Sequence, residues 1–174
     1  MKLDRIYTRG GDAGRTSLGD GARVPKHHLR VHAVGGLDEA NAAIGVARLH
    51  IEDAEVGNVL ALAQNDLFDV GADMCRPEQP EANRQPLRVS AQQVLTVERQ
   101  IDRFNEALSP LTSFVLPGGS PASAYLHLAR TMVRRAERDM AELAAGEAVN
   151  AEALKYVNRL SDLLFVLGRY TNQR

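Results

Sequence analysis

The chain has 174 residues, of which 44% are hydrophobic and 25% are charged, values typical of a globular protein. We therefore expect residues 1–174 to form a single domain. The formal net charge of −1 excludes a sequence-independent grip on nucleic acid, which needs a large excess of basic side chains. Because Cys75 is the only cysteine, the sequence excludes an intrachain disulfide and a multi-cysteine metal site.

No part of the sequence has the pattern of a targeting or membrane segment. The charged N-terminus is not followed by the apolar run that a signal peptide requires. The longest uncharged stretch, residues 107–129, contains prolines and glycines that exclude a membrane helix. We therefore expect a cytoplasmic protein with no membrane partner.

The first 26 residues show neither a helical nor a strand period, so we expect an ordered, glycine-rich loop there. A helical period begins after Gly35 and Gly36, and its apolar face comprises Leu37, Ala40, Ile44, Ala47 and Ile51. A second helix is predicted from Val56 to near Pro77, which cannot continue it. Prolines within residues 76–89 then favour a surface loop.

Three further helices have clear start signals. Ser90 with Gln93 forms a capping box, Ser120 before Pro121 is an N-cap, and Asn150 caps the last helix. The apolar stripe predicted for the fourth helix comprises Tyr125, Leu128, Met132, Ala136 and Leu143. With no strand predicted, the fold class is all-α, a five-helix bundle with an ordered Gly-rich N-terminal loop.

The segment Thr8–Gly21 has the composition of a phosphate-binding loop. Glycines let backbone N–H groups converge on an anion, and hydroxyl and cationic side chains complete the cradle. The candidate side chains are Thr8, Arg9, Arg15, Thr16, Ser17 and Lys26. The segment is not a Walker A motif, because its spacing is one residue short and an arginine stands for the lysine. The alternative interpretation is a loose N-terminal arm.

The fourth helix carries a cluster of cationic side chains. At about 100° per residue, Arg130, Arg134, Glu137 and Arg138 share one face, and Arg135 lies at its flank. Forked guanidinium donors suit a polyphosphate better than lysines do. The alternative is a solvated face with Glu–Arg pairs, which is the commoner reason for such a pattern.

The fifth helix has a polar-edged stripe of Asn158, Asp162, Phe165 and Arg169. Asn158 suits a hydrogen bond to a ribose or a phosphate, and Asp162 suits the orientation of an arginine. The alternative is a polar pair between two helices.

Asp38 follows the predicted start of the first helix, where the helix dipole favours an acidic residue. The functional interpretation is that Asp38 holds an arginine of the fourth helix, in its own subunit or in a neighbouring one.

Other groups of residues do not have the spacing of a metal site. The histidines at 27, 28 and 32 have no carboxylate at ligand spacing, and the absence of Glu-x-x-His excludes a ferritin-like di-iron site.

Four segments together resemble the PduO-type ATP:cob(I)alamin adenosyltransferases. They are YTRGGDAG at 7–14, FVLPGG at 114–119, RTMVRRAER at 130–138 and YVNRLSD at 156–162. The segments follow the family's order over nearly the whole chain. Each motif is weak alone, whereas the combination is specific.

The resemblance implies a single cobalamin adenosyltransferase domain, assembled as a homotrimer with active sites between subunits. The implied reaction moves the 5′-deoxyadenosyl group of ATP to the cobalt of cob(I)alamin and releases triphosphate, with Mg²⁺ accompanying the ATP. A flavoprotein reductase and a B12-dependent acceptor enzyme are the implied partners.

The resemblance also assigns site residues. The implied ATP site comprises Thr8, Arg9, Gly10, Gly11, Thr16, Ser17, Lys26, Arg134, Arg135, Glu137, Arg138 and Asn158. The implied cobalamin site comprises Phe114, Asp38, Arg130 and Asp162, and the catalytic set comprises Arg134, Phe114, Asp38 and Arg130. Asp38 and Arg130 match an intersubunit ion pair, and Phe114 matches an aromatic residue that displaces the lower axial base of the corrinoid.

The chain departs from the family's usual Thr-Gly-Asp-Lys-Gly loop at two positions. Gly10 replaces the threonine and Ala13 replaces the lysine, so Arg15 is the candidate to supply the missing cation.

Two other functions stay open from the sequence. One is a non-catalytic carrier or sensor of adenosylcobalamin and ATP, and the other is a structural helical bundle with merely solvated arginines.

Overall fold

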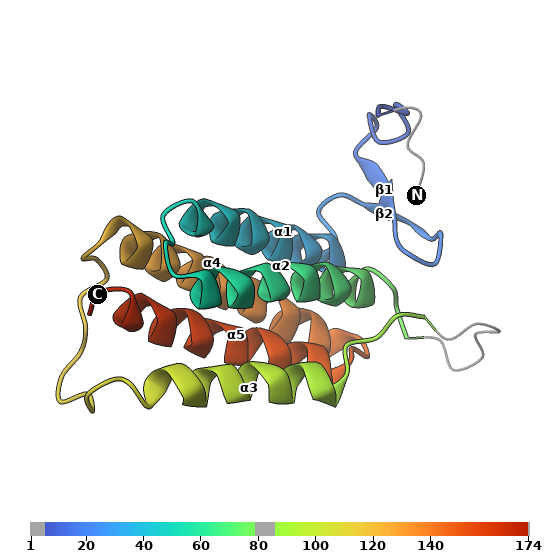
Figure 1. Ribbon diagram of the computed structural model, residues 1–174. Helices are drawn as coiled ribbons and strands as arrows, with labels where there is room; N and C mark the ends of the chain where they lie inside the picture. The colour runs from blue at the N-terminus through green and yellow to red at the C-terminus, as the bar shows by residue number, and fades with distance from the viewer. Residues whose placement is uncertain (1–5, 79–85, 174) are drawn as a thin grey trace.

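A computed structural model describes residues 6–78 and 86–173, and the described residues contain five helices (Figure 1). They are α1 (Leu29–Arg48), α2 (Ala54–Met74), α3 (Ala91–Asn105), α4 (Pro121–Gly146) and α5 (Ala151–Tyr170). The five-helix bundle is therefore confirmed. In the described ranges, no helix is both long enough and apolar enough to cross a membrane.

The glycine-rich segment contains a short hairpin that the sequence did not predict. Strands β1 (Arg15–Ser17) and β2 (Arg23–Pro25) pair antiparallel, with Thr16 opposite Val24. Three residues on each side are too few to show an alternating pattern, which explains why the sequence analysis found no strand. The hairpin projects beyond the end of the bundle where α1 begins and α2 ends (Figure 1).

The predicted helix starts at Ser90, Ser120 and Asn150 are confirmed as N-caps. Ser90 and Gln93 form the expected capping box. The Asn150 side chain accepts a hydrogen bond from the backbone N–H of Glu152 at 3.0 Å. These local signals are reliable because a cap satisfies backbone donors within its own turn and needs no distant partner.

The apolar stripe predicted for α4 is partly wrong. Tyr125 and Leu128 are exposed, whereas the buried apolar positions are Leu126, Ala129, Val133, Ala136, Met140 and Leu143. This spacing of three and four residues follows the seam along which α4 packs on α1 and α5. The exposed large residues of the first turns misled the prediction, because side-chain size outweighed the true period.

The start of α1 is also corrected. The helix begins at Leu29, with the His28 side chain accepting from the N–H of Arg30, and it passes straight through Gly35 and Gly36. Gly36 is buried where α1 crosses α4, and a Cβ there would lie 3.2 Å from the Cα of Ala136. The glycine pair therefore permits close helix packing and does not start the helix.

We expect Gly36→Ala to destabilise the fold relative to its matched control, Gly35→Ala. A Cβ at Gly35 would meet nothing within 4 Å, so alanine there gains about 1 kcal/mol of helix propensity. At Gly36 the same gain is opposed by overpacking against α4, so that variant is expected to be at least ~1 kcal/mol less stable than the control. Urea unfolding checks the difference, and equal stabilisation by both alanines would refute the close-packing argument.

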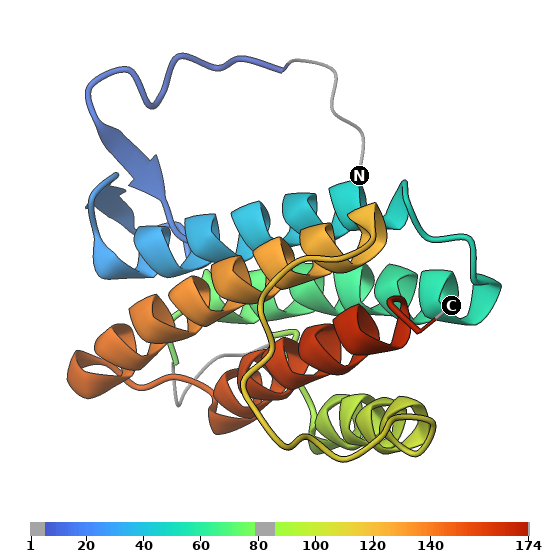
Figure 2. The same cartoon turned by 90° about the vertical axis from the view of Figure 1, so that its left-hand side faces the viewer.

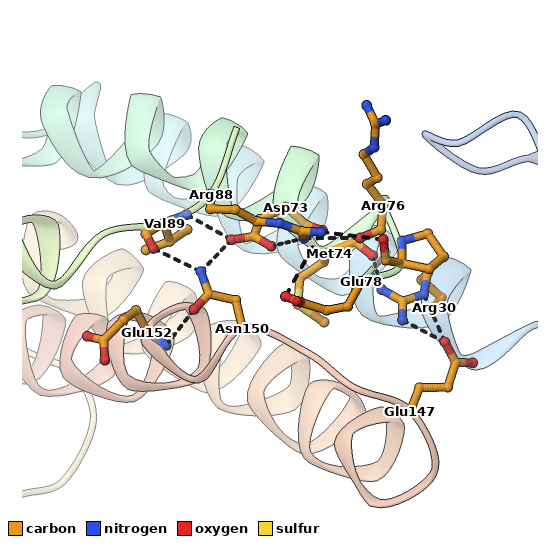
Figure 3. A network of polar contacts seen from close by, with 11 residues as sticks. Arg30, Asp73, Met74, Arg76, Glu78, Arg88, Val89, Glu147, Asn150 and Glu152 are labelled. Carbon is orange, nitrogen blue, oxygen red and sulfur yellow. Dashed lines mark hydrogen bonds and ion pairs between the residues drawn. The ribbon is translucent and has the colours of Figure 1, made fainter. Parts of the chain in front are cut away.

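A polar network fastens the helix ends beside the glycine-rich segment (Figure 3). The buried carboxylate of Asp73 accepts from Arg88 at 2.5 Å, from the N–H of Val89 at 2.8 Å and from Asn150 at 2.7 Å. Arg30, also buried, donates to the carbonyl of Met74 at 2.7 Å and to Glu147 at 2.6 Å. The network joins α1, α2, the start of α3 and the α4–α5 turn, so the root of the hairpin has a rigid support.

The connection from α3 to α4 lies at the opposite end of the bundle. Figure 2 shows this connection running across the front of α5, from the end of α3 to the start of α4. The C-terminus lies beside it in Figure 1. The predicted surface loop at residues 76–89 is described only in part, because residues 79–85 lie outside the described ranges.

Candidate active site

The hairpin holds Ser17, one of the hydroxyl residues of the predicted phosphate loop, in an ordered unit. Arg23 donates to the carbonyl of Gly10 at 2.6 Å and to the hydroxyl of Ser17 at 3.2 Å. The backbone N–H of Gly19 donates to the carbonyl of Cys75 at 2.9 Å, which ties the hairpin to the end of α2. These contacts argue against a loose arm for the described part of this segment.

Two of the predicted cations, Arg9 and Lys26, lie at the turn before β1. Arg9 adopts a φ of 60°, an uncommon conformation for a residue other than glycine, and its guanidinium lies 5.6 Å from the centroid of the Tyr7 ring. Lys26 folds back over the turn, since a Cβ at Gly11 would lie 3.1 Å from its Nζ. Arg15 instead donates to the carbonyl of Arg23 at 2.5 Å. Lys26 and Arg23 therefore bring their cations to the Gly10–Gly11 turn, whereas the guanidinium of Arg15 contacts the carbonyl of Arg23.

The arginines of α4 divide into two groups. Arg135 pairs with Glu39 of α1, as the solvated-face alternative predicts. Within the described residues, no carboxylate forms an ion pair with Arg130, Arg134 or Arg138. Arg134 and Arg138 are exposed, and Arg138 donates to the backbone carbonyl of Arg134 at 3.0 Å. This part of α4 is therefore a cationic face on which Arg134 and Arg138 have no direct ion pair among the described residues, which leaves their guanidinium groups available to an anionic ligand.

Next to this face, Asn158 of α5 is oriented by two neighbours. Its amide donates to Glu137 at 2.8 Å, and its carbonyl oxygen accepts from Arg159 at 2.5 Å. Arg159 is held in turn by Glu98 of α3 at 2.9 Å. The Glu137–Asn158 bond joins two predicted site residues from different helices, and it matches both the functional interpretation and the simple interhelical polar pair.

Asp162 lies one turn beyond Asn158. Partial desolvation raises the pKa of its carboxyl, and Glu137 raises it too, whereas the positive charges of Arg159 and Arg134 lower it. These neighbouring charges show that Asp162 belongs electrostatically to the same face as Arg134 and Glu137. The structure therefore brings five predicted residues together here, namely Arg134, Glu137, Arg138, Asn158 and Asp162.

Asp38 occupies a different face. It lies ten residues into α1, so stabilisation by the helix dipole, which acts in the first turn, does not explain it. It lines a groove of about 360 Å³ between α1 and α2, together with Leu37, Leu67 and the exposed ring of Phe68. Its neighbour Glu39 is the residue that faces α4. No ion pair between Asp38 and Arg130 occurs within the described parts of this chain.

Arg130 and His127, which lie one to two turns before Arg134 on α4, carry polar atoms without hydrogen-bond partners among the described residues. The Nε atom of Arg130 is buried, and so are both ring nitrogens of His127, and none has a hydrogen-bond partner among the described residues. Burial lowers the pKa of His127, and the charge of Arg130 lowers it further, so the ring is neutral at pH 7. A half-buried arginine with spare donors suits a partner outside this chain.

Phe114 is fully exposed on the α3–α4 connection, as is Leu116, with 90% of its surface accessible. Large apolar side chains at a loop tip expose surface that a ligand or a second copy of the chain can cover. The structure thus separates the predicted residues into four places. They are the hairpin, the α4–α5 face, the groove between α1 and α2 that Asp38 lines, and the α3–α4 connection, called the Phe114 loop below.

The sequence matches the family model for cobalamin adenosyltransferase over residues 6–171. The chain belongs to this family. A relative from Mycobacterium tuberculosis, a corrinoid adenosyltransferase, is 50% identical over 175 residues, covering 99% of this chain and 91% of the relative. The corrinoid adenosyltransferase PduO of Salmonella typhimurium is 42% identical over 164 residues, covering 94% of this chain and 48% of its own length.

Solved structures of the family share the fold. A phenylalanine-to-histidine variant of the PduO-type ATP:corrinoid adenosyltransferase from Lactobacillus reuteri, complexed with cobalamin and ATP, matches with a TM-score of 0.91 and 34% identity. The match covers 97% of this chain and 91% of that one. An arginine-to-lysine variant complexed with ATP matches with a TM-score of 0.87 at 34% identity. This adenosyltransferase family member is therefore an enzyme, a transferase of the adenosyl group of ATP to a corrinoid.

Sequence reasoning missed one residue that shapes the ATP-loop candidate. Arg23 was not singled out, yet its guanidinium joins the Gly10 turn to Ser17 across the hairpin. Its role depends on the β1–β2 register, in which Ser17 lies opposite Arg23. A cross-strand signal becomes visible only when the strands themselves are recognised.

Proposed function

We propose that this adenosyltransferase family member transfers the 5′-deoxyadenosyl group of ATP to cob(I)alamin at a site shared by two copies in a homotrimer. The cationic face of α4, with Arg134 and Arg138 free of ion pairs in the described residues and Asn158 oriented beside it, carries the proposal. We assign this face to the triphosphate and the ribose of ATP. ATP-dependent conversion of the cob(I)alamin spectrum to that of adenosylcobalamin by the purified protein is the test of this reaction.

The separation of the predicted residues supports a shared site. The hairpin projects from one end of the bundle, whereas the Phe114 loop lies at the other end (Figure 1). Asp38 faces the α1–α2 groove, away from the α4 side of its own chain. A second copy whose Asp38 lies beside Arg130 would supply the acceptor that the half-buried guanidinium lacks among the described residues. The same assembly would bring a hairpin to the arginine face.

The chemistry needs placement more than a protein nucleophile. Cob(I)alamin supplies the electron pair that forms the Co–C5′ bond, while the C5′–O bond to triphosphate breaks and the cobalt becomes formally Co(III). The protein must hold C5′ in line with the leaving triphosphate. It must also stabilise negative charge on that leaving group, a role that we give to Arg134, Arg138, Lys26 and the N–H groups of the Gly10–Gly11 turn.

We propose that Mg²⁺ enters with ATP and is held by phosphate oxygens and water, with Thr16 and Ser17 as hydroxyl candidates from the predicted loop. Mg²⁺ commonly keeps several waters and takes few protein ligands. Bound Mg²⁺ would supply additional positive charge to the triphosphate.

We assign Phe114 to the lower face of the corrinoid, where an apolar ring would displace the axial base of cob(II)alamin. Loss of that ligand makes the reduction to cob(I)alamin easier, because a bound donor stabilises the oxidised cobalt. The full exposure of Phe114 leaves its ring available for this contact. The flavoprotein reductase, the B12-dependent acceptor enzyme and the cytoplasmic location stay predictions.

A charge swap tests the shared site. Asp38→Arg and Arg130→Asp alone are each expected to lower kcat/KM for the corrinoid at least roughly tenfold, because each leaves two like charges facing across the interface. The double variant restores the pair with reversed polarity and should recover most of the activity. Steady-state kinetics and sedimentation check this, and additive losses in the double variant would exclude the pairing.

A further inference from the structure

The C-terminal end of α5 holds both ends of the Phe114 loop. At the start of the loop, Arg169 donates through Nη2 to the carbonyl of Ser109 at 2.6 Å. At its end, the Asn172 amide accepts from the N–H of Ser120 at 2.8 Å and donates to the carbonyl of Gly118 at 3.0 Å. Two side chains from the C-terminal end of the chain therefore fix the two ends of the loop.

The contact at Asn172 is built into the backbone of the loop. Gly119 has a φ of 107°, and a Cβ there would lie 2.3 Å from Oδ1 of Asn172. Only glycine at position 119 therefore leaves room for the Asn172 amide beside this turn. The Gly118 carbonyl also accepts from the buried hydroxyl of Ser123 at 2.9 Å, so the turn is held from α4 and from the C-terminus together.

Between these anchors the loop has little support of its own. Within the described residues, no hydrogen bond joins residues 110–117 to another part of the chain. Phe114 and Leu116 are exposed, and Figure 2 shows the connection crossing in front of α5. The hydrogen bonds that hold this loop are therefore those at its two ends, and none of them lies next to the Phe114 ring.

We propose that Asn172 and Arg169 are positioning residues that hold the Phe114 ring at the position where it contacts the corrinoid. The inference rests on the proposed function, because it deepens the role given to Phe114. A loop released at one end would sample many conformations, and the ring would spend less time where it displaces the axial base. Neither residue touches the reacting atoms, so each acts only through the loop.

The test compares Asn172→Ala with Gln173→Ala, a control at the neighbouring exposed position. Turnover is measured from cob(II)alamin with a reductant and, separately, from chemically prepared cob(I)alamin. Asn172→Ala is expected to lower the cob(II)alamin rate roughly tenfold, the scale of one to two lost hydrogen bonds, and to leave the cob(I)alamin rate within about twofold. Asn172→Asp, which keeps the acceptor for Ser120, should fall between wild type and Asn172→Ala.

Two further readouts separate positioning from mere stability. The absorption of bound cob(II)alamin should show less of the form without its axial base in Asn172→Ala. In a Phe114→Ala background the same substitution should cost nothing more, because its effect passes through that ring. Equal losses in both assays with a lower Tm, or an undiminished loss in the Phe114→Ala background, would overturn the inference. A wild type inactive with cob(I)alamin would instead overturn the proposed function, and this inference with it.

Discussion

Arg134→Ala is expected to lower kcat by at least roughly a hundredfold, the scale seen when one preorganised donor to a developing charge is removed. Arg134 is exposed, and none of the described carboxylates forms an ion pair with it, so its guanidinium is available to the triphosphate. Arg138, which donates to the Arg134 carbonyl, would remain in place because that bond uses only the backbone of residue 134. The loss should therefore come from charge stabilisation alone.

The fold should tolerate this change. Alanine has a higher helix propensity than arginine, and position 134 buries no apolar surface in the bundle, so Tm should change by no more than a few degrees. Arg99→Ala, at an exposed arginine on α3, is the matched control and should keep wild-type activity. Arg134→Lys should recover only part of the rate, since an ammonium lacks the forked donors. Undiminished turnover in Arg134→Ala would remove this residue from the mechanism.

Phe114→Ala is expected to separate reduction from transfer. We expect the rate from cob(II)alamin to fall roughly a hundredfold, while the rate from prepared cob(I)alamin falls less than about fivefold. The physical reason is that the ring acts before electron transfer, on the axial ligand, and has no part in forming the Co–C5′ bond. Because Phe114 is fully exposed, its removal creates no cavity and should leave Tm unchanged.

The control for Phe114 is Leu111→Ala, a second exposed apolar residue of the same connection. It should keep the cob(II)alamin rate, because our account gives it no contact with the axial base. If Phe114→Ala lowered both rates by the same factor, the ring would serve general corrinoid binding. If it lowered neither, the loop would have no part in the reaction.

The sequence predicted those parts of the fold that depend on local interactions. Ser90, Ser120 and Asn150 cap their helices as expected, because a cap needs only its own turn. Features that depend on tertiary packing were predicted less well. The Gly35–Gly36 pair looked like a helix start, yet Gly36 is a contact point with Ala136. The face of α4 was misjudged because Tyr125 and Leu128 are large but exposed.

For the candidate site, too, features that depend on local spacing were predicted better than features that depend on tertiary packing. Spacing alone placed Arg134, Glu137 and Arg138 on one face, and the orientation of Asn158 by Glu137 agrees with it. The position of Asp38 in the α1–α2 groove could not be inferred, since it depends on which helices flank α1. The contributions of Arg23 and Asn172 also lay beyond reach, because both act on backbone carbonyls whose positions only the folded chain defines.

An anaerobic optical assay tests the central claim most directly. Purified protein is mixed with chemically reduced cobalamin, Mg²⁺ and ATP, and the spectrum is followed while triphosphate is measured. We predict ATP-dependent conversion of the cob(I)alamin spectrum to that of adenosylcobalamin, with one triphosphate released per product formed. Absence of conversion, with a rise in Tm on adding ATP, would contradict the account and favour a non-catalytic binding protein with an altered loop at Gly10 and Ala13.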